Sequence, residues 1–74
     1  SDEFSIIETK IPKEWIGKSL IELNPRKKFG FNVIAEKVNG VYKNNIDADK
    51  PFGDQESIIV IGDNEKLLKV FKEG

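Results

Sequence analysis

The sequence has no cysteine and no histidine among its 74 residues. Without cysteine it can form neither a disulfide nor a thiolate metal site, which fits a reducing compartment such as the cytosol. Without histidine as well, the usual zinc sites and the Ser/His and Cys/His arrangements of nucleophilic catalysis are excluded by inventory. The sequence therefore gives no reason to expect an enzyme or a metal centre.

A long apolar run and a strong net charge are also lacking. The longest aliphatic run, Ile58 to Ile61, is far short of the roughly 20 residues that cross a membrane, and no signal-peptide pattern opens the chain. The 12 basic and 13 acidic residues are interspersed and give a formal net charge of −1. The chain then has no overall positive electrostatic field that would attract nucleic acid or an anionic membrane. We therefore expect neither a nucleic-acid partner nor direct membrane insertion.

Methionine is absent too, and the chain begins Ser1-Asp2-Glu3. We therefore expect a piece of a longer protein, with residues 1–3 as a linker from a preceding domain. A chain this short forms one domain and buries only about 60 % of the surface that its unfolded form exposes. Its core is marginal, and we expect a partner subunit to add to it.

Apolar patterning predicts four strands. Residues 4–11 are rich in β-branched side chains and are followed by Pro12, which places that strand near a sheet edge. Residues 31–38 alternate, with Phe31, Val33 and Ala35 on one face and Asn32, Ile34 and Glu36 on the other. Asn39-Gly40 then predicts a tight hairpin into a strand that ends at about Ile46, because both central positions of a type I′ turn favour positive φ. Residues 57–61 are apolar at consecutive positions and predict a central strand.

Helices are predicted in two places. Residues 17–23 carry apolar side chains at helical spacing, and the segment ends at Asn24-Pro25 because proline disfavours helical geometry in the residue before it. Asn24 can cap a second short turn that Gly30 closes. After Asp63, a suitable N-cap, a last helix is predicted to bury one apolar stripe, made of Leu67, Leu68, Val70 and Phe71.

The predicted order is thus β-α-β-β-β-α over a single domain, residues 1–74. Short hairpin connections favour antiparallel pairing. The fold class that we expect is α+β, a two-layer domain with helices packed on an antiparallel sheet.

One candidate binding site joins the first helix to the second strand. Leu20 and Ile21 can cover a purine face, Arg26 can bind a phosphate through two N–H groups, and Asn32 can pair with a base edge. Such a set suits a planar heteroaromatic ligand that bears phosphates. The same residues also fit a structural interpretation, with the aliphatic pair in the core, Arg26 in a solvated turn and Asn32 at the start of a strand.

Two further charged segments carry weaker signals. Residues 47–56 resemble a calcium loop in composition, but Pro51 stands at a ligand position and Gly53 comes one place late, which favours a solvated loop. Asp47 and Asp49 have no cleft-forming sequence around them that would suit acid/base work. The Arg26-Lys27-Lys28 cluster is too small for a nucleic-acid footprint.

Four segments carry a resemblance to a known family: IGKSLIEL at 16–23, FGFNVIA at 29–35, Gly53-Asp54 and IIVIGD at 58–63. At these residues the sequence resembles the TrkA-C family, the C-terminal domain of RCK (regulator of potassium conductance) proteins, and the resemblance spans nearly the whole length of the chain. The resemblance implies a homodimeric regulatory domain of a bacterial potassium-uptake gating subunit. It also implies a cytoplasmic location at the inner face of the membrane, through a membrane potassium-transport subunit bound by the full-length protein.

Within that family, the gating subunits of Ktr-type potassium transporters carry a cyclic di-AMP motif. It comprises two Ile/Leu residues, any two, Asp, any one, Arg, any five, Asn, Ile or Val, and Ile. This chain departs from it at Asn24, which replaces the aspartate, and Phe31 before Asn32 offers no hydrogen bond to a phosphate. The ligand-binding residues that the resemblance implies are Leu20, Ile21, Asn24, Arg26, Phe31, Asn32, Val33 and Ile34.

Two hypotheses follow. In the first, cyclic di-AMP is a regulatory ligand bound across the two-fold axis of the homodimer, and its binding lowers potassium uptake; no cofactor is required. A two-fold symmetric ligand makes the same contacts with each subunit, so its binding free energy favours one dimer geometry. In the second, the domain is a ligand-free structural dimerisation module of a cation transporter or antiporter regulator.

Overall fold

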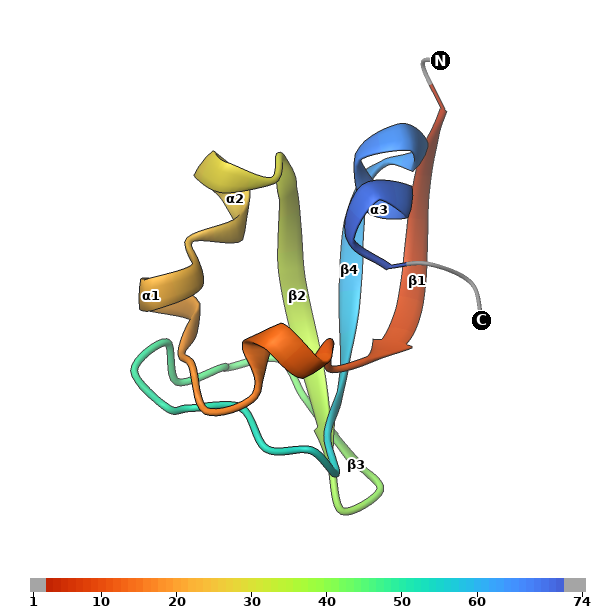
Figure 1. The fold of residues 1–74 in the computed structure, drawn as a ribbon. Helices are drawn as coiled ribbons and strands as arrows, with labels where there is room; N and C mark the ends of the chain where they lie inside the picture. The colour runs from red at the N-terminus through yellow and green to blue at the C-terminus, as the bar shows by residue number, and fades with distance from the viewer. Residues whose placement is uncertain (1–2, 72–74) are drawn as a thin grey trace.

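The computed structural model describes residues 3–71, which fold into two layers (Figure 1). One layer is a four-stranded antiparallel sheet in the order β1-β4-β2-β3. Its strands are β1 (Phe4–Lys10), β2 (Phe31–Val38), β3 (Val41–Lys43) and β4 (Ser57–Asp63). The α+β class and the strand order along the chain are as predicted, with the 4–11 strand at an edge and the strand at 57–61 in the centre.

Helical segments form the second layer and pack on one face of the sheet. They are the 3₁₀ helix η1 (Lys13–Trp15) and the α-helices α1 (Leu20–Leu23), α2 (Pro25–Lys28) and α3 (Asn64–Val70). Phe31, Ile58 and Val60 of the sheet are the largest fully buried side chains and face this layer. The opposite face stays open, and Phe4, Ile6 and Tyr42 are largely exposed on it.

The first predicted helix is shorter than expected. Gly17 has φ +85°, outside the right-handed helical region, and α1 begins only after Ser19. The Ser19 hydroxyl accepts from the Glu22 N–H at 3.3 Å and the Glu22 carboxylate accepts from the Ser19 N–H at 3.0 Å, a reciprocal capping box. Ile16 lies outside the helix and forms a parallel bridge to Phe52 instead.

The step from α1 to β2 is a left-handed turn followed by one helical turn. Asn24 has φ 45°, Pro25 occupies the first position of α2, and Gly30 at φ +83° ends it, as the sequence predicted. The Asn24 side chain makes no capping hydrogen bond, so that part of the prediction is wrong. Its backbone carbonyl accepts from the Lys28 N–H at 2.9 Å instead.

A bulge at Ile34 changes the faces of β2. Val33 pairs with Val60 and Ala35 pairs with Ile59, so the pairing register shifts by one residue between them. The predicted alternation therefore holds for Phe31 to Val33 and is wrong beyond Ile34. Glu36, expected beside Asn32 on one face, instead pairs with Ile58 on the helical side and is only 5 % exposed.

The hairpin prediction is confirmed at its turn and wrong at its end. Asn39 and Gly40 have φ of 51° and 79°, the two positive values that a type I′ turn needs. Strand β3 stops at Lys43 rather than near Ile46. The following polar segment is not purely solvated either, because Phe52 is buried, and its N–H and carbonyl bond to Lys18 and Gly17 at 2.9 and 2.8 Å.

Aromatic rings form the centre of the core. Trp15 is buried, and its ring centroid lies 5.7–6.2 Å from those of Phe29, Phe31, Phe52 and Phe71. Aromatic pairs at such separations contribute about 0.5–1.5 kcal/mol each beyond the area that they bury. Trp15 therefore joins the helical layer, the sheet and the 44–56 segment as a core residue.

Asp63 is the N-cap of helix α3 as predicted, and its carboxylate accepts from the Glu65 N–H at 2.8 Å. Leu67 and Phe71 are buried, but Leu68 is 57 % exposed, so the predicted stripe is wrong at Leu68. Successive residues of a helix point about 100° apart, and a helix of two turns buries only one narrow side.

Candidate functional site

The eight predicted ligand-binding residues divide into an outward and an inward group. Ile21 is 61 % and Ile34 is 42 % exposed, and Asn24, Arg26 and Asn32 are exposed as well. The inward group packs in or against the core: Leu20, Phe31 and Val33. The structure thus separates the aliphatic pair, with Leu20 anchoring α1 and Ile21 presented to solvent.

Local backbone geometry holds the outward residues in place. The α1 turn carries Ile21, and the Ile21 N–H donates to the Ala48 carbonyl at 3.1 Å. Sequence reasoning missed this contact from the 44–56 segment, although Phe52, an isolated aromatic in a polar run, was a signal that the segment packs. Asn32 pairs with Ile61 on the open face of the sheet, and the bulge projects Ile34.

Asn24, Arg26 and Lys27 line an open hollow of about 510 Å³. Among the described residues, no carboxylate forms an ion pair with Arg26. Its guanidinium is therefore available to an external anion, and Lys27 adds a second positive charge. The aspartate of the motif would have supplied a neighbouring charge, but Asn24 is neutral. Ile21, Asn32 and Ile34 do not line this hollow, so one copy of the chain presents the predicted residues on an open surface rather than in an enclosed pocket.

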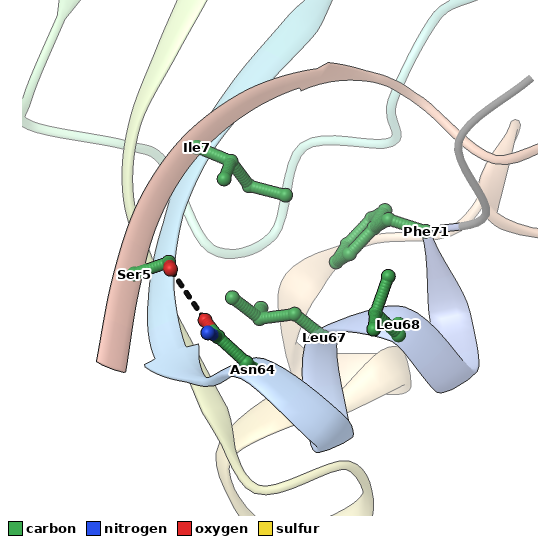
Figure 2. Close-up of a pocket in the computed structure, with 6 residues that line it drawn as sticks. All are labelled: Ser5, Ile7, Asn64, Leu67, Leu68 and Phe71. Atoms are coloured by element: carbon green, nitrogen blue, oxygen red, sulfur yellow. Dashed lines mark hydrogen bonds between the residues drawn. The ribbon is translucent and has the colours of Figure 1, made fainter. Parts of the chain in front are cut away.

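A second, smaller hollow lies between β1 and α3 and involves none of these residues. Figure 2 shows Ser5 and Ile7 of β1 facing Leu67, Leu68 and Phe71, with the Ser5 hydroxyl donating to the Asn64 side chain. Its volume is about 230 Å³ and its lining is mainly apolar. The exposed Leu68 forms one of its walls.

The described residues contain no group of three or more acidic side chains arranged to hold a metal ion. Asp47 and Asp49 are exposed, and the Asp47 carboxylate accepts from the Asp49 N–H at 3.0 Å, an Asx turn in a surface loop. Among residues 3–71, no helix has the length and apolar character needed to span a bilayer.

No protein-family model matches the sequence. The fold is nevertheless that of an RCK C-terminal domain. The chain resembles KtrA in particular. It is 28 % identical over 74 residues to the Ktr system potassium uptake protein A of Bacillus subtilis (strain 168), and spans a third of that protein's length.

Solved structures give the same result. The RCK C domain of the potassium transport protein KtrA, in complex with cyclic di-AMP, matches with a TM-score of 0.82 and 29 % identity, over 92 % of this chain and 80 % of the other. The RCK_C domain dimer of Streptococcus agalactiae BusR, also in complex with cyclic di-AMP, has a TM-score of 0.69 and 21 % identity, over 92 % and 88 % of the two chains. At that identity, the second match shows the fold alone.

Proposed function

We propose that this domain binds cyclic di-AMP between two copies of the chain and regulates a bacterial potassium-uptake system. The observation that carries the proposal is the exposed Arg26, which forms no ion pair with any of residues 3–71. Ile21 and Ile34, at the sequence spacing of the cyclic di-AMP motif, are exposed as well. The resemblance to the KtrA domain, solved with that ligand, supports the choice of ligand.

Each outward residue has a role that its chemistry suits. Arg26 donates two parallel hydrogen bonds to a phosphate, Asn32 pairs with an adenine edge, and Ile21 and Ile34 cover the base. Leu20, Phe31 and Val33 pack in or against the core and so fix the backbone that carries these residues. A base that covers the two isoleucines also removes their apolar surface from water, at about 25 cal/mol per Å².

The second copy packs against the open face of the sheet. Phe4 and Ile6 leave exposed apolar side chains there, and exposed apolar patches mark interaction sites. Asn32 lies on the same face, so dimer contact and ligand site are continuous. The two-fold axis then brings two half-sites together around one symmetric ligand.

In the full-length protein, the domain acts at the inner face of the cell membrane through its potassium-transport partner, and cyclic di-AMP lowers potassium uptake. Such switching requires that the ligand bind one state of the assembly more tightly than the other, by about 1.4 kcal/mol for each tenfold shift.

Calorimetric titration of the chain with cyclic di-AMP tests the ligand. Removing the charge-assisted hydrogen bonds of Arg26, worth roughly 1.5–3 kcal/mol, should weaken binding at least about tenfold in Arg26→Ala. Lys28→Ala also removes one positive charge, but Lys28 lies outside the hollow at Arg26, so this variant should change cyclic di-AMP affinity little. Equal affinities for Arg26→Ala and the unmodified chain would refute the proposal.

Sedimentation of the same chain tests the dimer. Ile6→Asp places a charge on the open face and should shift the domain to monomer, whereas Leu68→Asp, at a similarly exposed residue of α3, should leave the dimer intact. A dimer that binds no cyclic di-AMP, and whose melting temperature the ligand does not raise, would favour the ligand-free dimerisation module instead.

A further inference from the structure

A second charged hollow lies between the end of α2 and α3, in segments far apart in sequence. Its volume is about 320 Å³, at the lower end of small-ligand sites. Four of its lining residues are lysines and none is a carboxylate: Lys27, Lys28, Phe29, Gly30, Lys66, Lys69 and Val70.

Within the described part of the chain, none of the four lysines forms an ion pair. Four like charges around one hollow repel one another, and an anion in the hollow relieves that repulsion. The chain as a whole has net charge −1, so the cluster does not simply reflect a basic composition.

The side chain of Lys66, from α3, lies beside Gly30 in the α2–β2 turn. A Cβ on Gly30 would lie 2.7 Å from the Lys66 Cδ and 3.1 Å from its Nζ, so the Lys66 side chain lies directly over the bare glycine backbone. The ammonium of Lys66 thus lies close to the α2–β2 turn. The α2–β2 turn and α3 thus place lysines on both sides of the hollow.

An adjoining hollow with a mainly apolar lining continues from this one. It has a volume of about 790 Å³ and shares Phe29, Lys69 and Val70 with the first. Its other lining residues come from the β1–η1 region: Pro12, Lys13, Glu14 and Trp15. The two hollows therefore form one groove. Lysines line one end, and mainly apolar side chains line the other, where Lys13 and Glu14 are the charged residues. We call it the lysine groove.

We propose that the lysine groove binds a mononucleotide, with its phosphate chain among Lys28, Lys66 and Lys69 and its base over Phe29 and Val70. Lysine ammonium groups bind phosphates as point charges, and an aromatic edge beside an aliphatic side chain suits a planar base. A nucleic-acid strand needs a longer basic track with several stacking platforms.

The lysine groove is separate from the proposed cyclic di-AMP site. Only Lys27 lines both the groove and the hollow at Arg26. Lys66 and Lys69 line the groove alone, so substitution at these two positions distinguishes one site from the other.

Calorimetry with ATP as the probe tests the proposal, with inorganic tripolyphosphate and adenosine in parallel titrations. ATP should bind, tripolyphosphate should bind more weakly, and adenosine should not bind measurably. Lys66→Gln/Lys69→Gln keeps the aliphatic stems and removes two charges, so ATP affinity should fall at least about tenfold, the effect of one lost charge-assisted bond of about 1.4 kcal/mol or more. Lys10→Gln/Lys50→Gln makes the same change at two exposed lysines outside the groove and should change ATP affinity by less than about twofold.

Several outcomes would overturn this assignment. They are no ATP binding at millimolar concentration, an equal loss of affinity in the Lys10/Lys50 control, or binding to anionic lipid vesicles without binding to ATP. Loss of ATP binding in Arg26→Ala would place ATP in the cyclic di-AMP site and would also overturn it. The Lys66→Gln/Lys69→Gln variant should keep its affinity for cyclic di-AMP, so failure of either site is seen independently of the other.

Discussion

The Tyr42 hydroxyl donates a hydrogen bond of 2.8 Å to the Glu8 carboxylate, which joins the two edge strands across the open face of the sheet. The same carboxylate lies 3.8 Å from the Lys37 ammonium, and that ammonium lies 5.0 Å from the centre of the Tyr42 ring. Glu8, Lys37 and Tyr42 thus form a polar cluster at one end of a face whose other end carries Phe4 and Ile6.

Tyr42→Phe removes the hydrogen bond and keeps the ring. Because the pair is exposed, we expect a loss of only about 0.5 kcal/mol in the free energy of unfolding, at the low end for a hydrogen bond. Urea unfolding of Tyr42→Phe, Glu8→Ala and the double variant measures the coupling between the two side chains. Strictly additive effects would show that they act independently.

Gly62→Ala should destabilise the domain through a steric clash. Gly62 pairs with Phe31 in the centre of the sheet, and a Cβ there would lie 2.6 Å from the Phe31 Cβ and 3.2 Å from its Cα. Overpacking of this kind costs about 1–3 kcal/mol, which should lower the melting temperature by several degrees. Gly53→Ala is the control, because its Cβ would meet only the movable Glu56 carboxylate at 3.4 Å and should change the midpoint little. Similar melting temperatures for both variants would contradict this packing.

Trp15→Ala should strongly destabilise the domain and lower its urea midpoint. Removing a buried tryptophan costs about 3–5 kcal/mol, a large part of the 5–15 kcal/mol that stabilises an ordinary domain. Leu68→Ala, at an exposed site, should stay within about 0.5 kcal/mol of the unmodified chain. Far-ultraviolet circular dichroism during urea unfolding measures both, and a midpoint unchanged in Trp15→Ala would show that its ring contacts are dispensable.

Asn24→Asp restores the aspartate of the cyclic di-AMP motif and tests its role in the proposed site. Asparagine and aspartate both tolerate the left-handed geometry seen at φ 45°, so the turn should persist. A carboxylate beside Arg26 would orient the guanidinium, and we expect cyclic di-AMP affinity to rise by about threefold to tenfold, up to roughly 1.4 kcal/mol. Asn45→Asp adds the same charge in an exposed loop and should have no such effect. A fall in affinity in Asn24→Asp would mean that the added charge repels the ligand phosphates.

Much of this fold is determined by local sequence. Asn39-Gly40 specifies its turn because few residues accept two successive positive φ angles, and Pro25 and Gly30 bound a helical turn for equally local reasons. The spacing of Arg26 and Asn32 was likewise available from the sequence, and both residues are exposed as a binding role requires.

Tertiary structure decided what local signals leave open. The bulge at Ile34 follows from pairing with β4 and sends Glu36 to the helical side, and burial of Trp15 depends on four phenylalanines spread along the chain. The lysine groove exists only because α3 packs beside the α2–β2 turn. Local propensities act over a few residues, whereas register, burial and the gathering of distant charges depend on which segments meet when the core closes.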